Sequence, residues 1–307
     1  MKLRISSALP SSEMTNLSSP LAVVAHDAGA TNLIIGWLKD QPNLTLRTCL
    51  QGPATALWSA AFPNWKNKSL SEALDGAAML LSGTGWASDL EHEARRLARA
   101  MGVPSIGAID HWANYRERFI RNGEEVLPDE LWVTDEDARV EAVRCFADLP
   151  VRVLPNRYLE GLVEQIDALS PEPNERSGGH ILYVLEPIRQ PWGNNEEPGE
   201  FQALDFFLER IGALGLERNP EIRLRPHPSD PPRKYASWMS RHSELNLTID
   251  TSISLAEAIA WADWVVGCQS FAMVVALYAA RRVVSTNPPW APRCSLPQRG
   301  IQHLRDL

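Results

Sequence analysis

Near-continuous apolar runs alternate with helix-like segments along this chain, and that alternation constrains the fold more than any other feature. The runs "LAVVAHDAG" (21–29) and "GAAMLLSGTGW" (76–86) are typical of buried strands that end in a glycine loop. The segment "DLEHEARRLARAMG" (89–102) places apolar residues on one face and predicts an amphipathic helix that ends at Gly102. Strands that alternate with helices predict an α/β fold with a mostly parallel sheet covered on both faces.

The second half of the chain repeats this scheme after a polar break. Strand-like runs recur at 180–187, 221–228 and 263–268, and Ser254 and Glu257 form a capping box at the start of a helix. Between the halves, one helix and the stretch "SPEPNERSGG" have the composition of a linker. We therefore expect two Rossmann-like, doubly wound parallel-sheet domains that face a cleft. The expected boundaries are a disordered Ser-rich lead-in over 1–19, an N-terminal domain over 20–155, a linker over 156–179 and a C-terminal domain over 180–307.

The composition is that of a globular protein and limits the classes of partner. The net charge of −8 argues against a nucleic-acid partner and against anionic membrane surfaces, while it leaves peripheral membrane contact open. The four cysteines are far apart and form no CxxC pair, so we expect reduced thiols, no zinc site and a cytoplasmic location. No apolar run approaches the roughly 20 residues that span a bilayer, so we expect no transmembrane segment.

The stretch "IRLRPHPSD" (222–230) is the first candidate for a binding site, because it reads as a strand that runs into a stiff loop. The prolines on either side of His227 fix the backbone, and His227 and Arg225 can both donate to a phosphate oxygen. The alternative is a rigid turn whose histidine is only solvated.

The second candidate is a helix N-terminus that follows the strand ending at Cys268. Gln269 and Ser270 open this helix, where free N–H groups, the positive end of the dipole and the serine hydroxyl suit an anion. The alternative is that Ser270 serves only as an N-cap. Because the carboxyl ends of parallel strands share one edge, we expect His227 and Ser270 to converge on one phosphate.

Three loops of the first half suit acid–base chemistry or a sugar. In "AHDAGATN" (25–32), His26 and Asp27 can exchange protons and Gly29 lets a ligand approach the backbone, although Asp27 can instead cap the next helix. The glycine loop around Thr84 can cradle a sugar or be a flexible turn. The stretch "AIDHWANYRERF" (108–119) mixes aromatic and polar groups that suit a sugar, or it is an ordinary amphipathic segment; its candidates are Asp110, His111, Trp112 and Tyr115.

Taken together, these residues resemble the GT-B glycosyltransferases that use CMP-activated acidic sugars, which are the bacterial sialyltransferases, polysialyltransferases and Kdo transferases. The match is carried by His227-Pro228 and by Ser270 in the second half. The resemblance implies a metal-independent enzyme without a cofactor, which transfers sialic acid, another nonulosonic acid or a Kdo-type sugar to a hydroxyl acceptor.

The resemblance also implies roles for particular residues. Asp27, and after it Asp110, would accept the proton of the acceptor hydroxyl, while His227, Arg225 and Ser270 would stabilise charge on the departing phosphate. The cytidine would lie near "LEPIRQP" (185–191), which adds Glu186 and Pro187 to the nucleotide site. The final residues, from about 287, would return to the first domain.

Two related families and one non-enzymatic function are alternatives. The CDP-glycerol-type glycerophosphate transferases carry a similar "RPHP" with paired serines, and the UDP-N-acetylglucosamine 2-epimerases carry a His-Pro motif on the same two-domain fold. This chain has Phe271 after its single serine and lacks an "SGG" after the strand, so it departs from both patterns. A non-catalytic binding protein on the same scaffold is the remaining alternative.

Overall fold

The computed structural model describes residues 17–170, 178–216 and 220–307. The described chain divides into two compact units, an N-terminal unit that extends to Tyr158 and a C-terminal unit from Leu159 to Leu307. The division leaves all but the first two residues of helix α6 (Arg157–Leu169) in the C-terminal unit. Residues 1–16 of the predicted lead-in and 171–177 of the predicted linker lie outside the described residues.

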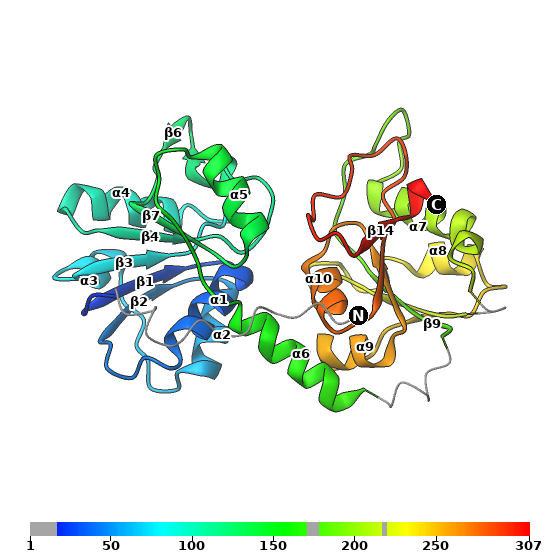
Figure 1. Cartoon of the computed structure of the whole chain (residues 1–307), viewed down its shortest axis with the longest axis horizontal. Helices are drawn as coiled ribbons and strands as arrows, with labels where there is room; N and C mark the ends of the chain where they lie inside the picture. Colours follow the sequence, from blue (N-terminus) through cyan, green and yellow to red (C-terminus); the bar gives the residue numbers. More distant parts are fainter. Residues whose placement is uncertain (1–16, 171–177, 217–219) are drawn as a thin grey trace. The chain divides into compact units, whose positions relative to one another are not determined.

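The N-terminal unit contains a parallel six-stranded sheet in the order β2-β1-β3-β4-β7-β8 (Figure 1). The strands are β1 (Leu21–Ala25), β2 (Leu46–Leu50), β3 (Met79–Ser82), β4 (Ser105–Ala108), β7 (Glu130–Val133) and β8 (Val151–Val153). The helices are α1 (Ala28–Leu38), α2 (Pro53–Ala61), α3 (Leu70–Leu74), α4 (Leu90–Met101) and α5 (Glu136–Cys145). A short antiparallel hairpin, β5 (Ile120–Arg121) and β6 (Glu124–Glu125), lies between β4 and β7 in the chain.

Strand β1 shows why this unit forms a two-sided core. All five of its residues are fully buried, and alternate side chains point to opposite faces of the sheet. Leu21 and Val23 pack with the tryptophans of α1 and α2, whereas Ala22 and Val24 pack with apolar residues of α3 and α4. Helices therefore cover both faces, as the continuous apolar run predicted.

The C-terminal unit contains a second parallel six-stranded sheet, in the order β11-β10-β9-β12-β13-β14. Its strands are β9 (His180–Val184), β10 (Glu221–Arg225), β11 (Leu247–Ile249), β12 (Trp264–Gly267), β13 (Arg282–Ser285) and β14 (Ile301–His303). Its helices after α6 are α7 (Gly199–Arg210), α8 (Ala236–Arg241), α9 (Leu255–Trp261) and α10 (Phe271–Tyr278). The predicted fold class, two doubly wound parallel sheets, is confirmed.

The last strand corrects one expectation. The residues after about 287 were expected to return to the first domain, but β14 pairs in parallel with β13 through Ile301 and Val283. The end of the chain therefore completes the sheet of the C-terminal unit. Hydrogen bonds to the free edge of β13 hold it there, and a three-residue strand gives little signal in the sequence.

The strand orders fix where a ligand can bind in each unit. In the N-terminal unit the chain passes from β1 to β2 on one side and β3 lies on the other, so the topological switch point lies between β1 and β3. In the C-terminal unit the switch point lies between β9 and β12. Ligands of open α/β sheets bind outside the carboxyl ends of the strands at such points.

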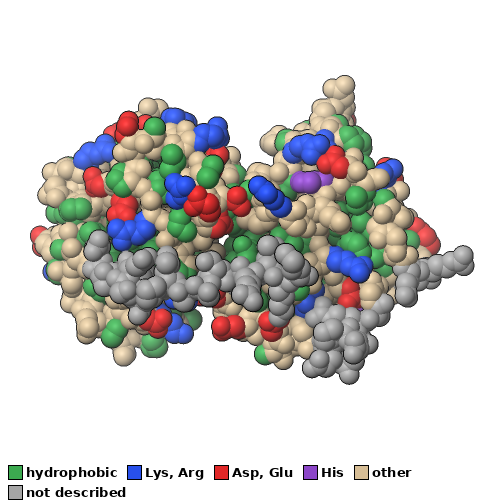
Figure 2. All heavy atoms as spheres, in the orientation of Figure 1, with side chains coloured by type: hydrophobic (Ala, Val, Ile, Leu, Met, Phe, Trp, Pro, Cys, Tyr) green, Lys and Arg blue, Asp and Glu red, His purple; other side chains and the backbone are tan. Residues whose placement is uncertain are grey.

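Two surface properties complete the description. Figure 2 shows Lys and Arg side chains mixed with Asp and Glu over the visible face of each unit. None of the helices in the described ranges combines the length and apolarity that a bilayer span requires.

Candidate functional site

A histidine–carboxylate pair follows β1 at the switch point of the N-terminal unit. His26 Nδ1 and Asp27 Oδ1 lie 2.7 Å apart, and the two side chains are 20% and 29% exposed. Asp27 is the N-cap residue of α1, yet its carboxylate turns to His26 rather than to the N–H groups of that helix. The capping alternative is therefore wrong, and the pair has the geometry of an oriented acid–base group.

Two glycines bring neighbouring loops against the carboxylates of this site. A Cβ atom at Gly85 would lie 1.9 Å from Asp27 Oδ2, and one at Gly29 would lie 1.8 Å from Asp110 Oδ2. Real Cβ contacts are never this short, so glycine is required at both positions while the carboxylates keep these places. The segments that follow β1, β3 and β4 therefore pack closely around Asp27 and Asp110, and glycine at positions 29 and 85 allows this close approach.

Asp110 forms an ion pair with Arg118, an arginine that was not predicted from the sequence. Arg118 Nη1 lies 2.9 Å from Asp110 Oδ1, and only 8% of the Arg118 side chain is exposed. The guanidinium also lies 5.5 Å from the centroid of the Trp86 ring, which is half exposed and offers an open aromatic surface. Asp27 is therefore the carboxylate better placed to accept a substrate proton, and Trp86 is better placed than the predicted aromatics to contact a sugar.

Glu91 is a second acid that the sequence analysis missed. It is fully buried, and its Oε1 accepts a hydrogen bond of 2.9 Å from the backbone N–H of His26. A Cβ at Gly83 would lie 2.8 Å from the same oxygen, so the carboxyl group lies at the switch point between β1 and β3. Oε2 is buried and has no hydrogen-bond partner among the described residues. In the sequence Glu91 looks like an exposed acid in the first turn of a helix, which is why it was missed.

Burial controls the charge of Glu91. It raises the pKa of Glu91 to about 7, and the nearby charge of Asp27 adds to the rise, whereas the His26 N–H group opposes it. The pKa of Glu91 therefore lies near neutral pH, and its carboxyl group is bonded to the backbone N–H of His26.

Several predicted sugar contacts are core residues instead. Thr84 is fully buried and donates to Ala108 O at 2.8 Å. Trp112 Nε1 donates to both oxygens of Asp135, and the Tyr115 hydroxyl donates to Ala138 O at 3.2 Å. Because only 7% of Trp112 and 2% of Tyr115 are exposed, neither ring has a face open to a sugar. His111 is half-buried and lies edge-on to Trp112, with ring centroids 5.6 Å apart.

At the switch point of the C-terminal unit, the N-terminus of α10 already holds a carboxylate. Glu186, which follows β9, accepts a hydrogen bond of 2.6 Å from the backbone N–H of Gln269. Burial raises the pKa of Glu186 to about 7, although the backbone N–H groups of 268–270 favour its charged form. The Ser270 hydroxyl caps α10 by accepting a hydrogen bond from Ala272 N at 3.2 Å. The predicted site residue Pro187 directly follows Glu186 in the chain. Any anion that enters this position meets Glu186.

The strand end at β10 is rigid, and its arginine is engaged. Arg225 forms an ion pair with the fully buried carboxylate of Asp250, which follows β11. The exposed His227 has its Nδ1 atom 2.7 Å from Ser229 Oγ, and the backbone N–H of His227 donates to Asp230 Oδ2 at 3.0 Å. Asp230 is itself held by Lys234, whose Nζ lies 2.7 Å from Oδ1. The loop therefore aims its histidine before a ligand binds.

His227 and Ser270 lie at the same edge of the sheet, but not beside each other. Strand β9 separates β10 from β12, so the two positions are two strand spacings, about 10 Å, apart. Glu186 follows the strand between them. In the described ranges, no group of three or more His, Cys, Asp or Glu side chains is placed to hold a metal ion.

Comparison with known proteins identifies the fold. No family model and no curated protein matches the sequence. A solved structure from Listeria monocytogenes, assigned as a UDP-N-acetylglucosamine 2-epimerase, superposes with a TM-score of 0.53 at 11% identity, over 87% of this chain and 79% of that one. MurG of Acinetobacter baumannii gives a TM-score of 0.43 at 12% identity, over 84% and 73% of the two chains. The first likeness is to the fold alone, and the chain has the two-domain α/β fold of the GT-B type.

Proposed function

We propose that this chain is a GT-B-type enzyme that acts on a nucleotide sugar and transfers the sugar to an acceptor hydroxyl. The observation that carries the proposal is the His26–Asp27 pair, which lies at the switch point of the N-terminal unit at a distance of 2.7 Å. A second acid, Asp110, lies at the same edge of the sheet, so the unit offers acid–base groups where substrates of α/β sheets bind.

In the proposed reaction the acceptor hydroxyl attacks the anomeric carbon of the donor. The bond from that carbon to the phosphate oxygen breaks, and the nucleotide leaves with the bonding electrons. Asp27 takes the hydroxyl proton as the new bond forms. His26, with its proton on Nδ1, donates to Asp27 Oδ1 and fixes the orientation of the carboxylate, as an orienting partner does in other acid–base pairs.

The donor that we propose is a CMP-activated acidic sugar, bound by the C-terminal unit. The support is the His227-Pro228 loop together with Ser270 and Gln269 at the start of α10, all at the carboxyl edge of one sheet. Glu186 adds a condition, because a phosphate near the α10 N-terminus is favoured when this carboxyl group is protonated.

The experiment that tests the donor class is a thermal-shift screen of the full chain against CMP, CDP, UDP and cytidine. We expect CMP to raise the melting temperature by several degrees, since a ligand that binds only the folded state stabilises it. Cytidine, which lacks the phosphate, should give a smaller shift. Stabilisation by UDP alone would reject the CMP donor, and no stabilisation by any nucleotide would favour a non-catalytic binding protein.

His227→Ala should weaken nucleotide binding about tenfold, because it removes a side chain that can make a charge-assisted bond to phosphate. The loop should persist, since Asp230 holds it through the backbone N–H of residue 227. Isothermal titration with CMP measures the change, and His242→Ala, at the C-cap of α8, is the matched control. Unchanged affinity in His227→Ala would remove the histidine from the site.

A nucleotide-sugar 2-epimerase is the second candidate. It is favoured by the likeness in fold to the Listeria protein and by the presence of two carboxylates and a histidine around one edge of the N-terminal sheet. Incubation with UDP-N-acetylglucosamine, followed by proton NMR, distinguishes the two reactions. Appearance of the C2 epimer without an acceptor would establish the epimerase and reject the transferase.

A further inference from the structure

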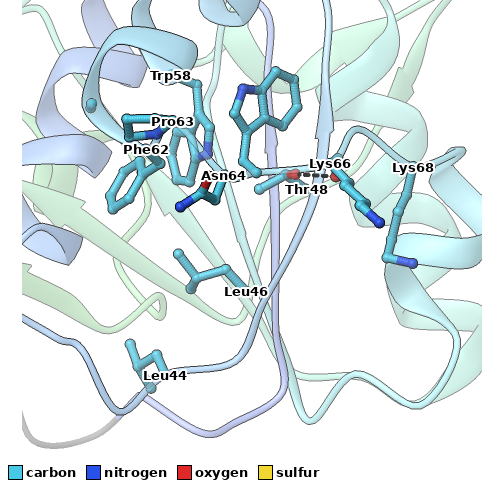
Figure 3. Close-up of a pocket in the computed structure, with 11 residues that line it drawn as sticks. Leu44, Leu46, Thr48, Trp58, Phe62, Pro63, Asn64, Lys66 and Lys68 are labelled. Carbon is cyan, nitrogen blue, oxygen red and sulfur yellow. Dashed lines mark hydrogen bonds between the residues drawn. The ribbon is translucent and has the colours of Figure 1, made fainter.

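A groove of about 580 Å³ opens in the N-terminal unit beside the edge strand β2 and the end of α2 (Figure 3). The segment 66–68 runs along the second half of β2: Lys68 N donates to Thr48 O at 2.8 Å, and the Asn67 side chain bonds both the N–H and the C=O of Leu50. Leu46, the first residue of β2, and Leu44, two residues before the strand, also line the groove. The volume is within the range of small-molecule sites.

The floor of the groove is apolar and preformed. Leu44, Leu46, Phe62 and Trp65 are half-buried and pack against the core of the unit. The rings of Trp58 and Phe62 are 4.6 Å apart, and Trp65 Nε1 donates to Ser59 Oγ at 2.9 Å, which fixes the indole. A ligand chain laid on this floor would therefore lose little free energy to the ordering of protein side chains.

One end of the groove is cationic. Lys66 and Lys68 are both exposed and both line it, and Figure 3 shows them on the side opposite Leu44 and Phe62. The lysines lie alongside Thr48, which is two residues, or about 7 Å, along β2 from Leu46. Two ammonium groups at one end of an apolar groove complement an anion. Glu72 is the neighbouring acid, and the charge of Lys68 contributes to lowering its pKa.

We propose that this groove binds a monomeric amphiphile, in which a single apolar chain lies over Leu44, Leu46 and Phe62 and a phosphate head lies between Lys66 and Lys68. The apolar floor supplies burial of the chain. The lysines supply charge-assisted hydrogen bonds to the head. A neutral sugar is a poor match, because this floor offers few polar groups to its hydroxyls.

The test is isothermal titration of the full chain with decyl phosphate below its micelle concentration. Decyl maltoside, with the same chain and an uncharged head, and inorganic phosphate, with no chain, should each bind about tenfold more weakly or worse, because each loses one of the two contributions. Equal binding of decyl maltoside would overturn the proposal, and so would equal binding of inorganic phosphate.

Variants locate the site. Lys66→Gln combined with Lys68→Gln should weaken decyl phosphate binding about tenfold, whereas Lys39→Gln, an exposed lysine after α1 of the same unit, should leave it unchanged. Leu46→Gln should weaken it several-fold through the floor. Wild-type affinity in the double lysine variant would reject the site. Flotation with phosphatidylglycerol vesicles but no binding of decyl phosphate would also reject it, because the surface would then contact a bilayer rather than hold a monomer.

Discussion

Asp27→Asn should lower turnover by a factor on the order of 10² or more while nucleotide binding is retained. The substitution keeps the shape and the hydrogen-bond acceptor that face His26 Nδ1 at 2.7 Å, but it removes the base that accepts the proton of the acceptor hydroxyl. Turnover with the nucleotide sugar that the thermal-shift screen identifies is the measurement. Asp40→Asn, an exposed acid just after α1, is the matched control and should have full activity.

Full turnover in Asp27→Asn would contradict the proposed base. Asp110→Asn should then be tested next, with the expectation that it also disturbs Arg118, whose Nη1 is 2.9 Å from the carboxylate. Loss of nucleotide binding in Asp27→Asn would show that the substitution acts through the fold instead of through proton transfer.

Glu91 should make the free energy of unfolding of the N-terminal unit decline by about 3 kcal/mol as the pH rises from 4.5 to 8, because its pKa increases from the usual 4.5 to about 7 on folding. The folded state binds the proton more tightly than the unfolded state in this window. The stabilisation is therefore fully present below the unfolded pKa and is lost as the pH rises through 7. Glu91→Gln, which cannot titrate, should remove this decline.

Urea unfolding at several pH values, with the transitions of the two units followed separately, measures the effect. Glu93→Gln is the matched control, since Glu93 is exposed on the same helix and its ion pair with Arg96 lowers its pKa out of the window. If wild type and Glu91→Gln show the same slope, folding does not raise the pKa of Glu91, and Glu91 is ionised in the folded state at pH 5.

Much of the fold could be predicted because it depends on local patterns. Strand β1 is a five-residue apolar run, which in a parallel sheet is buried on both faces. The predicted N-cap of α9 is present, with Ser254 Oγ accepting from Glu257 N at 3.1 Å, although the Glu257 carboxylate accepts from Ile253 N and so does not complete the capping box. Gly102 ends α4 in the left-handed conformation with φ of 69°. These features involve residues a few positions apart, so the sequence alone contains the necessary information.

The candidate site was less accessible from sequence because its contacts are long-range. The loops were found correctly as those that follow strands, but the partner of a side chain depends on packing. The bond from Gln269 N to Glu186 joins residues 83 positions apart, and the bond from His26 N to Glu91 joins residues 65 apart. The prediction that Trp112 contacts a sugar was wrong for a related reason. Its indole N–H donates to Asp135, which lies on another loop.

The two glutamates at the switch points have one consequence for any anionic ligand. Each unit keeps a carboxyl group of its own where a loop N–H group would otherwise meet a ligand: Glu91 at His26 N, and Glu186 at Gln269 N. Both titrate near pH 7, so an anion that binds beside either one draws a proton onto the protein. An anion that bound beside either carboxyl group would therefore be held more tightly as the pH falls through 7.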